Sequence, residues 1–281
     1  MRWPLTIAAL IGVGLPAQPR AQRFAAIGDY GTAGQPARDV AQLVHSWQPD
    51  FIITLGDNNY PYGDSTTIDQ NIGQYYHAYL HPYRGQYGAG AAENRFFPSL
   101  GNHDLHTAAG KPYHKYFTLP GNERYYDFVR GNVHFVVLNS NRAEPDGIDS
   151  TSRQAQWCRQ VLGSSTAPWR VVYFHHAPYC SGQHEARDLR WPFKQWGASV
   201  VLTGHNHLYE RLEVGGLTYI VNGLGGTPQR FRFRVLPIRG SRVRYRRNYG
   251  ALLADATATR LQLQFITRRG HVIDTFSLTR P

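Results

Sequence analysis

Five short polar motifs along the chain carry side chains that could hold metal ions. In order, they are Gly28–Gly31, Gly56–Tyr60, Gly101–Asp104, Val172–His175 and Gly204–His207. Their aspartate, tyrosine, asparagine and histidine side chains are oxygen and nitrogen donors suited to metals. Two ions about 3.5–4 Å apart that share a carboxylate can polarise a phosphoryl group, generate hydroxide and stabilise the leaving oxygen. The motifs therefore indicate a metal-dependent hydrolase.

Each motif follows an apolar run that has the character of a strand. The expected strands are Phe24–Ile27, Phe51–Leu55, Phe96–Leu100, Arg170–Phe174 and Ser199–Thr203. A helix expected at Pro36–Trp47 separates the first two, an order that predicts parallel strands. Ligands of open α/β sheets bind beyond the carboxyl ends of such strands, where loops converge. We therefore expect all five motifs to form one site.

The motifs occur in the order G-D-x-G, G-D-x-x-Y, G-N-H with a following acid, V-x-x-H and G-H-x-H. In this order they resemble the calcineurin-like metallophosphoesterase superfamily and, within it, the purple acid phosphatases of the tartrate-resistant acid phosphatase type. The resemblance extends from about Phe24 to Gly226. It implies an α/β fold, a four-layer α/β/β/α sandwich with two mixed sheets.

The resemblance also implies a set of metal ligands. Tyr60 is the discriminating residue, because most relatives outside the purple acid phosphatases lack a tyrosine there, and a phenolate suits iron(III). The second ion would be divalent: zinc, iron or manganese. The implied ligands are Asp29, Tyr60 and His207 on the ferric ion, Asp57 as the bridge, and Asn102, His175 and His205 on the second ion.

Two further histidines are expected to transfer protons or bind phosphate. His103 directly follows Asn102, and His184 lies nine residues after His175, a spacing similar to that in smaller family members. Histidine titrates near neutral pH and can donate a proton to a leaving alkoxide. A solvated loop histidine is the alternative for His184. His176 is expected to support the site or lie in the core, because adjacent strand residues point to opposite faces.

The expected function is that of a dinuclear phosphatase which hydrolyses phosphate monoesters by attack of a metal-bound hydroxide. A phosphodiesterase acting on nucleotides or phospholipid head groups with the same site is an alternative. A non-catalytic polyanion-binding protein on the same fold is another. The presence of all the implied ligands argues against this last alternative.

The N-terminus has the pattern of a secretory signal. Arg2 provides a positive charge and Leu5–Leu15 an apolar stretch, shorter than the roughly 20 residues that span a bilayer. We expect residues 1–21 to be a signal peptide, although a retained anchor is an alternative. Export to the periplasm or the extracellular space follows, with 22–281 as a single catalytic domain. No transmembrane anchor is expected, and we expect a monomer.

The chain of 281 residues has 42% hydrophobic residues, enough for one large domain. Its two cysteines, Cys158 and Cys180, form no C-x-x-C pair, which gives no indication of a zinc knuckle or redox motif. A disulfide between them and two buried thiols are both compatible with the sequence.

Arginine accounts for most of the formal net charge of +11. Much of the excess lies in Arg230–Arg247, where basic and apolar residues alternate as in a half-buried strand. We expect a hairpin insertion at about 229–248, turning around Pro237–Gly240. Its cationic outer face is either an ordinary solvated surface or a contact for a polyanion.

Overall fold

The computed structural model describes residues 21–228 and 236–280. Residues 1–20 of the expected signal peptide and the first half of the arginine-rich segment, 229–235, lie outside the described residues. Across the two described ranges, no helix combines the length and apolar character needed to cross a membrane.

The first sheet is mixed and carries three of the motifs. Its strand order is β13-β12-β11-β1-β2-β3, and the β1, β2 and β3 strands run parallel. Phe24 lies opposite Phe51, and Ile52 lies opposite Phe96. All four residues of β2 are buried, as expected of a strand covered on both faces. The strands are β1 (Gln22–Ile27), β2 (Phe51–Thr54), β3 (Phe96–Pro98), β11 (Gly250–Ala256), β12 (Arg260–Thr267) and β13 (Val272–Thr279).

The second sheet is also mixed, with the order β10-β8-β9-β7-β6-β5-β4. The neighbours β5, β6, β7 and β9 run parallel, and β6 and β7 precede the two histidine motifs. Its strands are β4 (Tyr126–Arg130), β5 (Val133–Val137), β6 (Trp169–Tyr173), β7 (Val200–Thr203), β8 (Tyr209–Val214), β9 (Leu217–Asn222) and β10 (Ser241–Tyr245).

Aromatic side chains hold the two sheets face to face. Phe24 and Phe51 of the first sheet meet Phe135 of the second edge-on, with ring centroids 5.1 and 5.4 Å apart. Tyr209 stacks on Phe265 at 4.3 Å in a second contact between the sheets. Such pairs contribute about 0.5–1.5 kcal/mol beyond the area they bury. This packing fixes the relative positions of the strand ends that carry the motifs.

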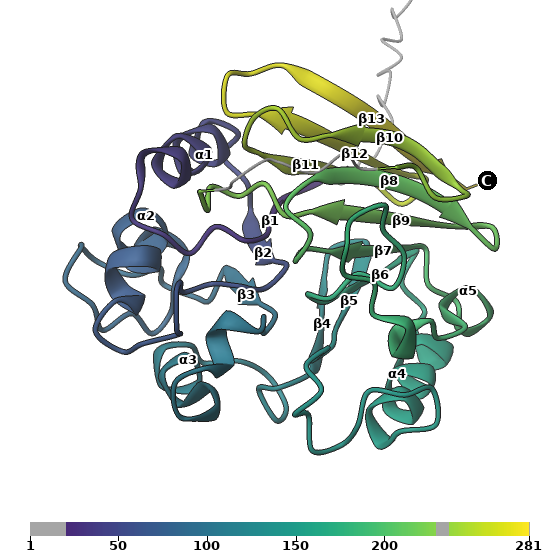
Figure 1. Ribbon diagram of the computed structural model, residues 1–281, viewed down its shortest axis with the longest axis horizontal. Coiled ribbons are helices and arrows are strands. Elements are labelled where there is room, and N and C mark those ends of the chain that lie inside the picture. The colour runs from purple at the N-terminus through teal and green to yellow at the C-terminus, as the bar shows by residue number, and fades with distance from the viewer. Residues whose placement is uncertain (1–20, 229–235, 281) are drawn as a thin grey trace, which may run out of the picture.

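Helices cover the outer face of each sheet (Figure 1), with α1, α2 and α3 beside the first and α4 and α5 beside the second. Pro36 occupies the first turn of α1, and Ser152 caps α4 by accepting a hydrogen bond from the Ala155 amide. The expected α/β/β/α sandwich is confirmed. The helices are α1 (Gln35–Ser46), α2 (Gln74–Tyr76), α3 (Lys111–Tyr116), α4 (Arg153–Ser164) and α5 (Phe193–Trp196), with a π-helical turn at Asp69–Gly73 and short 3-10 turns at His77–Tyr79, His103–Leu105, Ala108–Gly110 and Arg187–Leu189.

The arginine-rich segment forms a strand where its second half is described. In β10 the exposed Arg242 and Arg244 alternate with the partly buried Val243 and Tyr245, as the sequence predicts. β10 pairs antiparallel with β8, a strand that the sequence pattern did not reveal. The first strand of the expected hairpin lies outside the described residues.

The two cysteines are buried free thiols. Cys158 lies on α4, and Cys180 accepts a hydrogen bond from the Gly182 amide at 3.1 Å. Burial raises the thiol pKa of both residues. Of the two arrangements open from the sequence, the structure contains the unbridged one.

Candidate metal centre and active site

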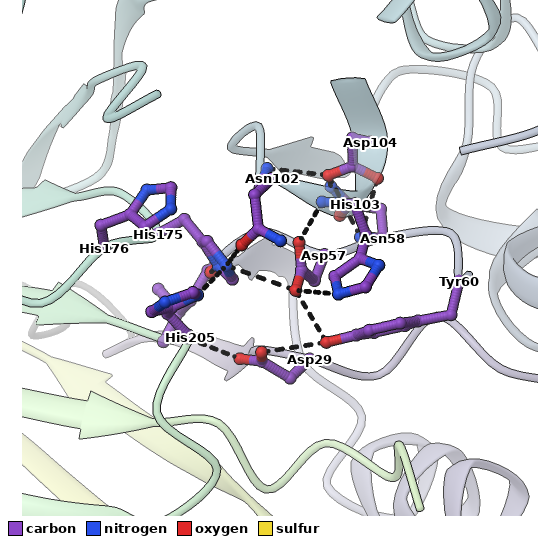
Figure 2. A network of polar contacts seen from close by, with 12 residues as sticks. Asp29, Asp57, Asn58, Tyr60, Asn102, His103, Asp104, His175, His176 and His205 are labelled. Atoms are coloured by element: carbon purple, nitrogen blue, oxygen red, sulfur yellow. Dashed lines mark hydrogen bonds and ion pairs between the residues drawn. The ribbon is translucent and has the colours of Figure 1, made fainter. Parts of the chain in front are cut away.

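The carboxyl ends of strands from both sheets meet at one place. Asp29, Asp57 and Asn102 follow β1, β2 and β3, whereas His175 and His205 follow β6 and β7. Figure 2 shows these side chains pointing toward one another. The expectation that the five motifs converge is therefore met by the geometry.

One group of donors gathers around the Tyr60 hydroxyl. This oxygen lies 2.7 Å from Asp57 Oδ2, 3.1 Å from Asp29 Oδ1 and 3.3 Å from His207 Nε2. His207 Nε2 is also 3.1 Å from Asp29 Oδ1. These are the four side chains implied as ligands and bridge of the ferric ion.

A second group gathers around His175 Nε2. This nitrogen lies 3.1 Å from Asn102 Oδ1, 3.1 Å from His205 Nδ1 and 3.3 Å from Asp57 Oδ2. Asp57 Oδ2 is therefore common to both groups. A single carboxylate oxygen between two donor clusters is the arrangement that a bridging ligand requires.

The backbone at three of these residues is held in the left-handed region. The φ angles are 55° at Asp29, 54° at Asp57 and 66° at His205. For residues other than glycine, such conformations cost about 1–3 kcal/mol each and cluster at functional sites. Hydrogen bonds fix them: the Asp29 amide donates to the Gly56 carbonyl at 3.1 Å, and the His205 amide donates to Asp29 Oδ2 at 2.9 Å.

Hydrogen bonding determines which nitrogen of His175 is available. Nδ1 lies 2.8 Å from the Leu55 carbonyl oxygen. Because a carbonyl can only accept, Nδ1 carries the proton and Nε2 is directed toward the donor cluster. The sequence did not reveal this contact, since Leu55 appears only as the last apolar residue before Gly56.

The electrostatics of the centre favour a bound cation. Burial acts against ionisation of Asp57 and His175, but their mutual attraction lowers the Asp57 pKa and raises the His175 pKa to about 9. Burial and the carboxylates of Asp29 and Asp57 raise the pKa of Tyr60 well above its usual value. A cation would take the place of these protons. The oxygen-rich donor set thus fits the expected metal pair, and the individual ligand assignments stay predictions.

His103 lies against the donor cluster with one ring nitrogen available. Its amide donates to Asp57 Oδ1 at 2.9 Å, and its Nδ1 donates to the Pro61 carbonyl at 2.6 Å. Nε2 remains available, 4.0 Å from Asp57 Oδ2. The ring packs on Tyr60 with centroids 4.3 Å apart. This position beside both donor groups suits proton transfer.

His184 lies beside His205. Its side chain is exposed, and its ring centroid is 5.5 Å from that of His205. Asn206 donates to the His184 carbonyl at 2.9 Å and so ties this loop to the G-H-N-H motif. The structure therefore brings His184 to the edge of the site, although its chemical role stays a prediction.

His176 lies closer to the centre than strand alternation predicts. Its ring centroid is 4.5 Å from that of His205, and its Nδ1 contacts Ser140 Oγ at 2.9 Å. The alternation argument does not apply, because β6 ends at Tyr173 and His176 lies in the following loop. Burial, with added repulsion from His175 and Arg142, lowers the His176 pKa to about 3.

Asp104 has a supporting role that the sequence did not reveal. Its buried carboxylate accepts from the amides of Asn58, Asn59 and Gly101 and from the Asn58 side chain, at 2.8–3.2 Å. Burial raises its pKa to about 7, while these four N–H donors favour the charged form. Asp104 thus joins the loop that carries Asp57 to the loop that carries Asn102.

Comparison with known proteins places the chain in a family. Residues 22–209 match the calcineurin-like phosphoesterase family, and the chain therefore belongs to it. This confirms the resemblance inferred from the five motifs. No sequence motif outside this range is needed for the assignment, since all five lie within it.

The curated relatives include purple acid phosphatases. The chain is 27% identical over 244 residues to purple acid phosphatase 23 of Arabidopsis thaliana, which covers 73% of this chain and 52% of the relative. It is 27% identical over 224 residues to a purple acid phosphatase of Glycine max, covering 72% and 46%. It is 22% identical over 243 residues to human tartrate-resistant acid phosphatase type 5, covering 73% of each. The chain thus spans about half the length of the first two relatives.

Solved structures share the fold at low sequence identity. GAP50, the anchor in the inner membrane complex of Plasmodium, superposes with a TM-score of 0.66 at 17% identity, covering 93% of this chain and 90% of that one. PhoD superposes with a TM-score of 0.56 at 16% identity, covering 94% and 69%. At such identities the likeness concerns the fold alone.

Proposed function

We propose that the chain is a dinuclear metal-dependent phosphatase that hydrolyses phosphate monoesters. The observation that carries the proposal is the position of Asp57 Oδ2, 2.7 Å from the Tyr60 hydroxyl and 3.3 Å from His175 Nε2. This oxygen lies between the two donor groups, as a bridging carboxylate does. The purple acid phosphatase relatives support the same activity.

The donor chemistry distinguishes the two halves of the centre. The half with Asp29, Tyr60 and His207 would hold iron(III), because a phenolate is a hard anionic donor. The half with Asn102, His175 and His205 would hold the divalent ion: zinc, iron or manganese. When bound, such a pair polarises the phosphoryl oxygens, activates the attacking water and stabilises the leaving oxygen.

Histidines of the protein would donate the proton that the leaving group needs. Because His103 Nδ1 donates to the Pro61 carbonyl, a second proton on Nε2 would face the centre and be available to the leaving alkoxide. The exposed His184 provides a second candidate beside His205, at the edge of the site. Either histidine could also hold a phosphoryl oxygen by donating a hydrogen bond.

Metal analysis combined with a visible spectrum tests the centre, and chromogenic substrates test the reaction. We expect two metals per chain, a phenolate-to-iron absorption band, and faster hydrolysis of p-nitrophenyl phosphate than of bis-p-nitrophenyl phosphate. Faster hydrolysis of the diester would instead favour the phosphodiesterase acting on nucleotides or phospholipid head groups. A metal-loaded protein that cleaves neither ester would contradict both enzymatic functions.

A non-catalytic polyanion-binding role is a second candidate. One structural relative is described as an anchor in a membrane complex, and a fold alone does not establish an activity. The arginines of β10 provide a positive surface for this role. The two donor groups favour the phosphatase over this role. A protein that hydrolyses neither ester but binds a polyanion tightly would instead favour the non-catalytic role.

Export is also part of the proposal and depends on the N-terminal sequence pattern. If residues 1–21 are a signal peptide, the mature protein begins near Gln22, the first residue of β1. Mass spectrometry of the protein expressed from the full chain would give the mature N-terminus. Recovery of the uncleaved chain in the membrane fraction would favour a retained anchor.

A further inference from the structure

A pocket of about 300 Å³ opens beside the divalent half of the centre. Asn102 and His205 line it together with His176 and His184. Arg142 lines the same pocket, although none of the five sequence motifs contains it. We call this cavity the Arg142 pocket. Since it adjoins donors of the centre, it is placed to hold the leaving group of a bound phosphate ester.

The loop that carries Arg142 is held in place by buried contacts. The Asn139 amide donates to Gln154 Oε1 at 2.8 Å, and its side chain donates to Glu144 Oε2 at 2.6 Å. Ser140 Oγ contacts His176 Nδ1 at 2.9 Å, which ties the loop to the site itself. Arg142 therefore extends from a fixed backbone, so less ordering entropy opposes its binding of a ligand.

The guanidinium of Arg142 is exposed and is not directly paired with an acidic side chain of the described residues. No hydrogen bond or ion pair of its side chain is found within the described residues. Glu185, which also lines the pocket, is paired with Arg190 at 3.0 Å and with Arg187 at 3.7 Å. Asp188 also lines the pocket and carries a negative charge. An exposed arginine beside a phosphate-handling site is a ready partner for a second anion.

We propose that Arg142 binds a second phosphate, one carried by the leaving group, and that substrates of the nucleoside diphosphate type are preferred over simple monoesters. This inference rests on the proposed phosphatase function. For ADP, the bond between the β-phosphorus and the bridging oxygen breaks, and its electron pair stays on the oxygen of AMP. Oxygen from water forms the new bond to phosphorus, so that ADP and water give AMP and inorganic phosphate.

The test compares kcat/KM for ADP and for AMP, because these substrates share a nucleoside and differ by one phosphate. Arg142→Gln should lower the ADP-to-AMP ratio of kcat/KM about tenfold, the loss expected for one charge-assisted contact. Asp188→Asn should raise the same ratio, because it removes a negative charge from the pocket. Arg159→Gln on α4, an exposed arginine outside the site, is the matched control and should leave the ratio unchanged.

Three results would overturn the inference. In the first, Arg142→Gln leaves the ADP-to-AMP ratio of kcat/KM unchanged, as Arg159→Gln does. In the second, Arg142→Gln lowers kcat/KM for ADP and for AMP by the same factor. In the third, Asp188→Asn lowers the ratio. Arg142→Lys retains the charge and should keep a ratio above that of Arg142→Gln, which separates binding from damage to the fold. A different result tests the proposed function itself: the phosphatase function is wrong if the metal-loaded wild type does not hydrolyse p-nitrophenyl phosphate.

Discussion

Tyr60 contributes a hydroxyl that contacts three other donors of the centre. It lies within 3.3 Å of side-chain atoms of Asp57, Asp29 and His207. Because burial and the neighbouring carboxylates raise its pKa, the phenol stays protonated until a cation replaces the proton. Metal binding should therefore release a proton from this side chain.

Tyr60→Phe should abolish the visible absorption band of the iron-loaded protein. The substitution removes the phenolate and leaves the ring that packs on His103. Visible spectra and iron analysis of the same samples provide the measurement. Tyr62→Phe is the control, since Tyr62 is 64% exposed, and it should keep the band. An unchanged band in Tyr60→Phe would exclude this residue as the chromophore.

His103→Ala should lower kcat by about 10²–10⁴-fold, the usual contribution of a general acid or base. Metal content should remain at the wild-type level, because His103 contacts Asp57 through its backbone amide. His271→Ala, at an exposed histidine remote in sequence from the motifs, is the control. Equal turnover in the two variants would refute a catalytic role for His103.

Asp104→Asn should destabilise the protein by about 1–3 kcal/mol, the cost of leaving buried N–H groups without an acceptor. The carboxylate accepts from four donors, and an amide would point its own N–H groups at some of them. Denaturant unfolding of the metal-free protein measures the change. Wild-type stability in this variant would show that Asp104 does not hold the two loops together.

At the scale of elements, sequence patterns predicted the strands that carry the motifs but missed two others. The buried runs of β1, β2, β6 and β7 are apolar and recognisable. β8 contains charged residues, so it does not appear as an apolar run. These residues have partners far away in the sequence: Glu210 accepts a hydrogen bond from the Ser181 amide at 2.7 Å, and Arg211 pairs with Asp274 at 2.7 Å. β13 is largely exposed at a sheet edge. Such strands depend on tertiary partners that are distant in sequence.

The turn after β2 needs a glycine for steric reasons. Gly56 has a φ of 84°, and a Cβ atom there would lie 2.5 Å from His175 Nδ1. Gly56→Ala should therefore displace the imidazole and lower both metal content and Tm. Gly163→Ala in α4 is the matched control, because no heavy atom lies within 4 Å of its Cβ position. That change should stabilise the helix by roughly 0.5–1 kcal/mol. Full metal content in Gly56→Ala would contradict this account.

At the scale of the whole molecule, the sequence predicted only part of the way in which the positive charge is arranged on the surface. Alternation in 241–245 correctly predicted an outward arginine face. Its partner strand β8 was not predicted, since the pairing joins residues more than 25 positions apart. The convergence of the motifs was predictable because the rule for strand ends is general. The position of Arg142 depends on the folded loop and had no sequence signal.

The arginine strip, which we define as Arg242, Arg244 and Arg247, should determine retention on a polyanionic column. All three are exposed. Replacing them with glutamate should lower the salt concentration at which the protein elutes from heparin, because fewer counterions are released on binding. A variant in which Arg153, Arg159 and Arg187 are replaced with glutamate has the same net charge and provides the control. Equal shifts in the two variants would show that only net charge matters.

Each proposed metal position takes donors from both sheets, with Asp29 and Tyr60 facing His207, and Asn102 facing His175 and His205. Neither half of the chain can assemble a complete coordination sphere before the other half has docked against it. Metal uptake would then be the last event in maturation, and the colour of the iron centre would report how much of a preparation has reached its final architecture. Immature chains would stay colourless even where iron is abundant.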